Sequence, residues 1–83
     1  MVEIEWSSVA EKDLNEIIDY IAQDSLEYAL VFYDQVKEKV ENLINFPKIG
    51  RIVPELDETN IRELLLRNYR IIYRILENKI QIV

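Results

Sequence analysis

The stretch that decides the fold is Ile61–Leu76, which reads IRELLLRNYRIIYRIL. It holds two runs rich in residues that favour strands, Ile61–Leu66 and Tyr69–Leu76. Only Arg67 and Asn68 separate the two runs, and Asn68 tolerates the positive φ that a tight turn requires. The stretch therefore predicts an antiparallel β-hairpin.

The second run of this hairpin is apolar on both faces, which is typical of a central strand. Its odd-numbered residues share one face: Tyr69, Ile71, Tyr73 and Ile75. Arg70 and Arg74 lie on the other face, where they either pair with carboxylates or form a recognition surface, because an unpaired buried guanidinium is costly. Arg62, on the first run, leaves the same two alternatives open.

Upstream of the hairpin, helical periodicity predicts two consecutive helices. Ser8 and Glu11 form a capping box, and apolar residues at steps of three and four continue the first helix to about Asp24. Asp24 and Glu27 repeat the capping pattern and open a second helix that ends before Pro47. Because the connection is so short, we expect an antiparallel helical hairpin.

The remaining segments complete an α+β domain that spans residues 1–83. Residues 2–6 alternate apolar and acidic side chains and read as a strand, and residues 80–83 read as a last strand after a turn. Residues 46–60 hold both prolines and the only glycine and are expected to form a loop against the body. The order β-α-α-β-β-β predicts a helical hairpin that covers one face of a small, mostly antiparallel sheet.

The charge of the chain argues against a general nucleic-acid binder. The net charge is −6, whereas affinity for nucleic acid rests on neutralising phosphates. Residues 1–45 hold three basic and eleven acidic side chains, and residues 46–83 hold seven and five. A partner could therefore bind a basic surface formed by the second half of an otherwise acidic domain. Alternatively, the acidic residues of the helices only provide solubility.

The amino-acid composition excludes several kinds of catalytic site. The chain has no Cys and no His, so it has no thiolate nucleophile, no Cys- or His-based metal site and no histidine base. One glycine cannot build a phosphate-binding loop, and we expect neither a cofactor nor a metal. Without a long apolar run or a signal peptide, the domain is expected to be soluble and cytoplasmic, with no membrane association.

Proton transfer without a metal would need a Tyr or Glu flanked by arginines. The residues of that kind are Glu55, Arg62, Arg70 and Tyr73. From the residues alone, the interpretation is a small α+β binding domain.

Three strings along the chain, FPKIGRIVPEL (46–56), IREL (61–64) and YRIIYRI (69–75), together resemble the ParE branch of the RelE/ParE toxin superfamily. IEWSSVAEKDLNEIIDYI (4–21) is similar to the first strand and helix of the same family. The resemblance implies a prokaryotic, plasmid-stabilisation-like toxin of a type II toxin–antitoxin pair. It also implies a cognate antitoxin whose C-terminal segment packs in the groove between helices and sheet.

The resemblance implies one of two targets. RelE-like members cut mRNA on the ribosome, whereas ParE-like members inhibit DNA gyrase without catalysing a reaction. This chain has Ile61 and Glu63 where the ribonuclease branch carries basic residues, although Arg70 matches the family's arginine and Glu55 falls near a glutamate of one ribonuclease subgroup. We expect a non-catalytic gyrase inhibitor. The alternatives are an mRNA endonuclease that uses Arg70, Glu55, Arg62 and Tyr73, or a non-toxic member that only binds its antitoxin.

The resemblance also yields expectations about partner contacts. The residues expected to bind a partner lie on the hairpin: Arg62, Tyr69, Arg70, Tyr73 and Arg74. Family members continue beyond the position of Val83, so we expect a member with a short C-terminus. Without its antitoxin, the domain is expected to expose apolar surface along the groove and sheet edge and to self-associate.

Overall fold

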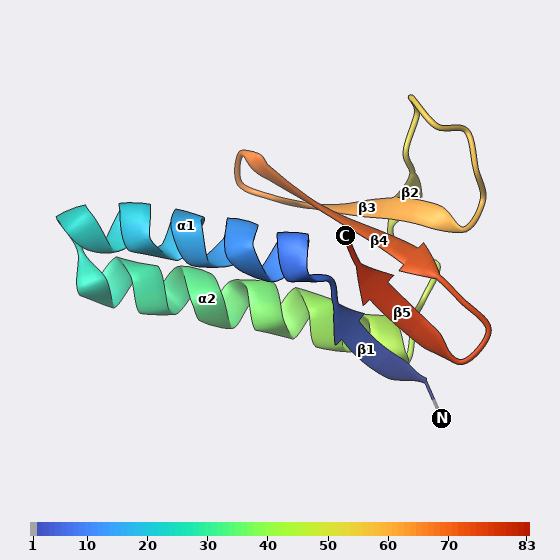
Figure 1. Cartoon of the computed structure of the whole chain (residues 1–83), viewed down its shortest axis with the longest axis horizontal. Coiled ribbons are helices and arrows are strands. Elements are labelled where there is room, and N and C mark those ends of the chain that lie inside the picture. The colour runs from blue at the N-terminus through green and yellow to red at the C-terminus, as the bar shows by residue number, and fades with distance from the viewer. Residues whose placement is uncertain (1) are drawn as a thin grey trace.

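The fold of residues 2–83 is described by a computed structural model (Figure 1). Its elements follow the expected β-α-α-β-β-β order, with one further short strand: β1 (Glu3–Trp6), α1 (Ser8–Asp24), α2 (Leu26–Glu41), a 3-10 turn (Asn42–Ile44), β2 (Arg51–Ile52), β3 (Ile61–Leu66), β4 (Tyr69–Ile75) and β5 (Lys79–Ile82). The α+β class and the helical hairpin are confirmed.

The sheet has the order β1-β5-β4-β3-β2, so β4 is central, as its two apolar faces predict. β1 runs parallel to β5, and the other neighbours are antiparallel. The two-residue strand β2 pairs Arg51 with Glu63 and Ile52 with Arg62 inside the segment that the sequence assigns to a loop. A strand of two residues is too short to show a periodic pattern, and the prediction of an uninterrupted loop is wrong there.

Both helices begin one residue away from the predicted caps. The Oγ of Ser7, not that of Ser8, accepts a hydrogen bond from the backbone N–H of Ala10 at 3.0 Å. Ser25, not Asp24, caps α2 through a bond from the N–H of Tyr28, also at 3.0 Å. The capping residue must have extended backbone angles, which Ser7 and Ser25 adopt.

The turn of the β3–β4 hairpin lies where it was predicted, but a different residue adopts the positive φ. Arg67, and not Asn68, has the positive φ, at 57°. The side chain of Arg67 reaches α2, where its Nη2 donates to Oε1 of Gln35 at 3.0 Å and its guanidinium lies 4.7 Å from the ring centre of Tyr28. These contacts offset the cost of a left-handed backbone at a residue other than glycine.

The core lies mainly between α2 and the sheet. The largest buried residues there are Phe32 of α2, Leu43 of the 3-10 turn, Tyr73 of β4, and Ile80 and Ile82 of β5. By contrast, Ala10 is the only fully buried residue of α1. The apolar stripe of α1 stays half-buried, and the connected end of the helical hairpin projects past the sheet (Figure 1). This leaves open apolar surface between α1 and β4.

Candidate partner-binding groove and its arginine

An apolar groove lies where α1 stands over the hairpin end of the sheet. It has a volume of about 160 Å³. Its floor is mostly apolar and is formed by Trp6, Leu14, Ile17, Phe32, Tyr69 and Ile71. The rings of Phe32 and Tyr69 pack edge to face with centres 5.4 Å apart. This contact joins α2 to β4 at the floor of the groove.

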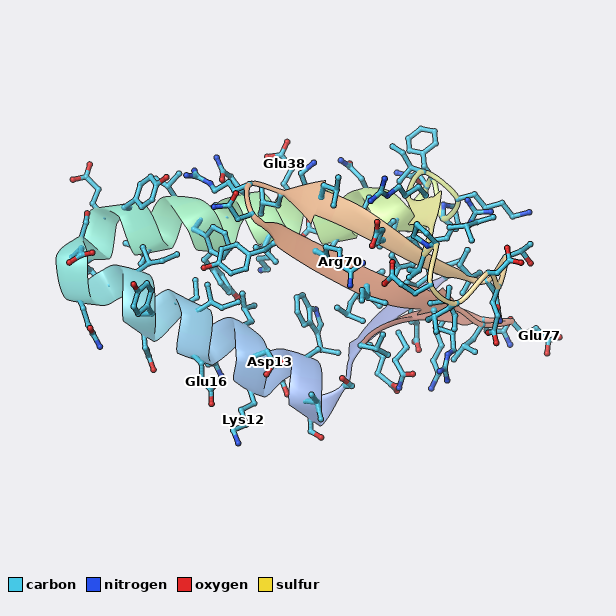
Figure 2. The ribbon with its side chains drawn as sticks, turned by 90° about the horizontal axis from the view of Figure 1, so that it is seen from above. Lys12, Asp13, Glu16, Glu38, Arg70 and Glu77 are labelled. Atoms are coloured by element: carbon cyan, nitrogen blue, oxygen red, sulfur yellow. The ribbon has the colours of Figure 1, made fainter. Side chains whose placement is uncertain are left out.

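One rim of this groove is acidic, since Asp13 of α1 lines it (Figure 2). Arg70 of β4 also lines it, but its guanidinium lies with Glu55 and Glu63 on the sheet face away from the helices. A shallower hollow continues along α1 between Asp13, Glu16, Ile17, Tyr20 and Tyr69. Together, the two hollows offer an apolar channel with an acidic rim, which suits an amphipathic peptide better than a small polar substrate.

Arg70 is tied to two carboxylates. Its Nη1 donates to Oε1 of Glu63 at 2.9 Å and to Oε2 of Glu55 at 3.1 Å. These carboxylates raise the pKa of Arg70, with the hydrogen bond to Glu55 as the largest cause. The structure therefore brings together two predicted site residues, Glu55 and Arg70, as an ion pair.

Glu63 is the centre of this network and was not predicted as a site residue. Its side chain is buried, at 1% exposed, on the sheet face away from the helices. The Nε of Arg51 donates to its Oε2, and Arg70 donates to its Oε1. The hydrogen bond from Arg51 is the largest cause that lowers the pKa of Glu63, and burial opposes it. A sequence signal existed, since Glu63 is an acidic residue that follows Arg62 in a mainly apolar strand.

Arg62 and Tyr73 lie away from the groove and hold the loop segments on either side of β2. Arg62 donates through Nη1 to the carbonyl of Gly50 at 2.9 Å and through Nε to that of Thr59 at 3.0 Å. The buried hydroxyl of Tyr73 donates to the carbonyl of Pro47 at 2.6 Å and accepts from the N–H of Gly50 at 3.0 Å. Burial raises the pKa of Tyr73. Both side chains thus have structural partners.

The other two predicted contact residues are accessible. Tyr69 is half-buried and lines both hollows, next to Arg70. Arg74 is exposed on the same face as Arg70 and forms no ion pair within residues 2–83. The acidic rim on α1 and Trp6 were not predicted as site residues, because the spacing of Asp13 and Glu16 also fits a solvated helix face.

Two further features bear on chemistry and location. In the part of the chain that the structure describes, no group of three or more acidic side chains is placed to hold a metal ion. No helix of residues 2–83 combines the length and apolar character needed to cross a membrane.

Comparisons with known proteins agree on one family. The family model described as "ParE toxin of type II toxin-antitoxin system, parDE" matches residues 4–83. A solved structure titled "Chromosomal ParDE TA system from P. aeruginosa" superposes with a TM-score of 0.76 at 27% identity. The match covers 99% of this chain and 90% of that one. No curated protein sequence matches the chain.

Proposed function

Because the chain belongs to the ParE toxin family of type II toxin–antitoxin systems, we propose that it inhibits DNA gyrase without catalysing a reaction and that a cognate antitoxin neutralises it in the prokaryotic cytoplasm. The observation that carries the non-catalytic part is the pairing of Arg70 with Glu55 and Glu63. Arg70 is the residue that matches the family's arginine, and it is already bonded to two anions.

An mRNA endonuclease needs free positive charge at the cleaved phosphate. The carboxylates of Glu55 and Glu63 already balance the positive charge of Arg70, and the chain as a whole carries a net charge of −6. Electrostatic repulsion at this site therefore supports the non-catalytic alternative.

The other two side chains considered for proton transfer, Tyr73 and Arg62, already form hydrogen bonds within the protein. The hydroxyl of Tyr73 is buried and bonded on both sides, and its raised pKa keeps it protonated at neutral pH, so it is not available as a base. The guanidinium of Arg62 is bonded to backbone carbonyls. Neither side chain is free to meet a substrate in this arrangement.

The groove supports an antitoxin as the partner. Amphipathic protein segments bind by laying their apolar face into a groove of this kind. The solved relative from P. aeruginosa is described as a ParDE system, which is consistent with a toxin that is paired with an antitoxin.

Two assays on the purified protein test the target. The protein is expected to block negative supercoiling of relaxed plasmid by gyrase and to leave ribosome-bound transcripts intact. Codon-positioned cuts in ribosome-bound mRNA that are lost in Arg70→Ala would instead establish the endonuclease. Harmless expression together with tight binding to the product of the adjacent reading frame would identify a member that only binds its antitoxin.

A further inference from the structure

The face of the sheet that lies away from the helices carries an arginine with no partner in the protein. The alternation of side chains along β4 places Arg70, Ile72 and Arg74 on this outer face. The other four arginines of the chain are bonded within the protein: Arg51 to Glu63, Arg62 to backbone carbonyls, Arg67 to Gln35, and Arg70 to Glu55 and Glu63. Arg74 is exposed, and within residues 2–83 its side chain forms no ion pair. Its guanidinium is therefore available to a partner from outside.

The acidic side chains near Arg74 are already engaged elsewhere. Both oxygens of the buried Glu63 accept hydrogen bonds from other arginines. Glu5 of β1 accepts from Nζ of Lys79 at 3.0 Å. Glu3 is exposed on the same edge strand, which β5 separates from β4. The positive charge of Arg74 is thus not balanced by a neighbour, although the chain as a whole has a net charge of −6.

The immediate surroundings of Arg74 are uncharged and partly apolar. Across the two neighbouring strands it is paired with Ile61 of β3 and Gln81 of β5, and Ile72 precedes it on the same face. Ile61 and Ile72 are half-buried, so each still presents apolar surface. A partner that covered this area would also desolvate Arg74, and a desolvated guanidinium requires a carboxylate. An arginine among apolar side chains is also the composition typical of the energetically important centre of a protein interface.

We propose that the outer face of the sheet around Arg74 is a second protein-binding surface, separate from the groove, and that it takes an acidic residue flanked by apolar residues. Charge complementarity selects this occupant, because a carboxylate can form two parallel hydrogen bonds with a guanidinium. The inference rests on the proposed function in one respect, since the natural segment would belong to the target protein, whereas the antitoxin is assigned to the groove on the helix side.

Three synthetic peptides and methyl NMR of the purified protein test this inference. The peptides share one sequence of Val, Leu and Thr and differ only in their central residue, which is Glu, Gln or Lys. The methyl groups of Ile61 and Ile72 report on the outer face. Those of Ile17 and Ile71 report on the groove, which both residues line. Titration therefore gives both the affinity and the place of binding.

The Glu peptide is expected to shift the methyl signals of Ile61 and Ile72 and to bind about fivefold more tightly than the Gln peptide, because it adds a charge-assisted pair at a solvent-exposed site. Arg74→Glu is expected to lose this preference and to bind the Lys peptide about fivefold more tightly than the Gln peptide. Lys12→Glu is the matched control. It makes the same change in net charge on α1, where Lys12 is exposed and forms no ion pair within residues 2–83. This control is expected to keep the wild-type preference.

Four results would overturn the inference: no binding of the Glu peptide, equal binding of the Glu and Gln peptides, shifts confined to Ile17 and Ile71, or the same change in Lys12→Glu as in Arg74→Glu. A single-stranded oligonucleotide that binds more tightly than the Glu peptide and depends on Arg74 would also overturn it, in favour of a nucleic-acid surface. The peptides contain no gyrase sequence, so a failure of gyrase inhibition leaves these outcomes unchanged and the two proposals can fail separately.

Discussion

The backbone of Gly50 lies directly against the side chain of Tyr73. The N–H of Gly50 donates to the tyrosine hydroxyl at 3.0 Å, and a Cβ at this position would lie 2.7 Å from that hydroxyl. The same Cβ would lie 2.7 Å from the carbonyl oxygen of Glu63. Only glycine fits here, and this contact anchors the chain before β2 to the central strand.

Gly50→Ala is therefore expected to destabilise the protein. The contact with the carbonyl of Glu63 involves the backbone of β3, which cannot move aside as a flexible side chain can. Overpacking of this kind costs about 1–3 kcal/mol of unfolding free energy. Urea unfolding measures the loss, with the exposed position Asn45→Ala as the control. An unchanged midpoint for Gly50→Ala would contradict this close packing.

The pH dependence of stability tests the buried carboxylate. The hydrogen bond from Arg51 lowers the pKa of Glu63 below its ordinary value of 4.5. A carboxyl with a lowered folded-state pKa contributes stability that is complete above its unfolded pKa and is lost as pH falls through the folded pKa. We expect the wild type to be more stable than Glu63→Gln at pH 7. The difference is expected to shrink as the pH falls below the unfolded-state pKa of the carboxyl and through its lower folded-state pKa. Urea titrations at several pH values measure this, and a constant difference would refute it.

The fold was predictable where periodicity is long, whereas the sequence indicated only some of the residues that the structure brings together at the site. The helices and the β3–β4 hairpin extend over enough residues for a period to emerge, so their existence and order are confirmed. The cap of α1 differs by one residue because Ser7 and Ser8 are adjacent and chemically identical, and the cap of α2 differs because Asp24 and Ser25 are both residues that favour this position. The burial of Glu63 depends on Arg51 and Arg70, which come from two other strands, and no local pattern encodes that meeting.

Two substitutions at Arg67 separate backbone strain from side-chain contact. Arg67→Ala and Arg67→Gly both remove the contacts with Tyr28 and Gln35, but only Ala keeps a Cβ at a φ of 57°. The Gly variant is expected to be more stable than the Ala variant by about 1 kcal/mol. Thermal or urea unfolding of the pair decides this. An Ala variant as stable as the Gly variant would show that the turn is not strained.

The isolated protein is expected to self-associate through its uncovered apolar groove. Light scattering over a range of concentrations should report a rising average mass. Ile17→Glu should reduce it, because Ile17 lines both hollows. Leu30→Glu is the control, since Leu30 is 58% exposed on α2 and does not line the groove. A monodisperse monomer at high concentration, or equal effects of both variants, would speak against this role of the groove.

The most direct test of the account is the supercoiling of relaxed plasmid by purified DNA gyrase in the presence of this protein. The reaction contains neither ribosomes nor mRNA, so the alternative endonuclease activity cannot contribute to the result. We predict that supercoiled product decreases as the toxin is titrated to a molar excess over gyrase. Supercoiling at the full rate under that excess, with a protein that is folded by circular dichroism, would contradict gyrase inhibition.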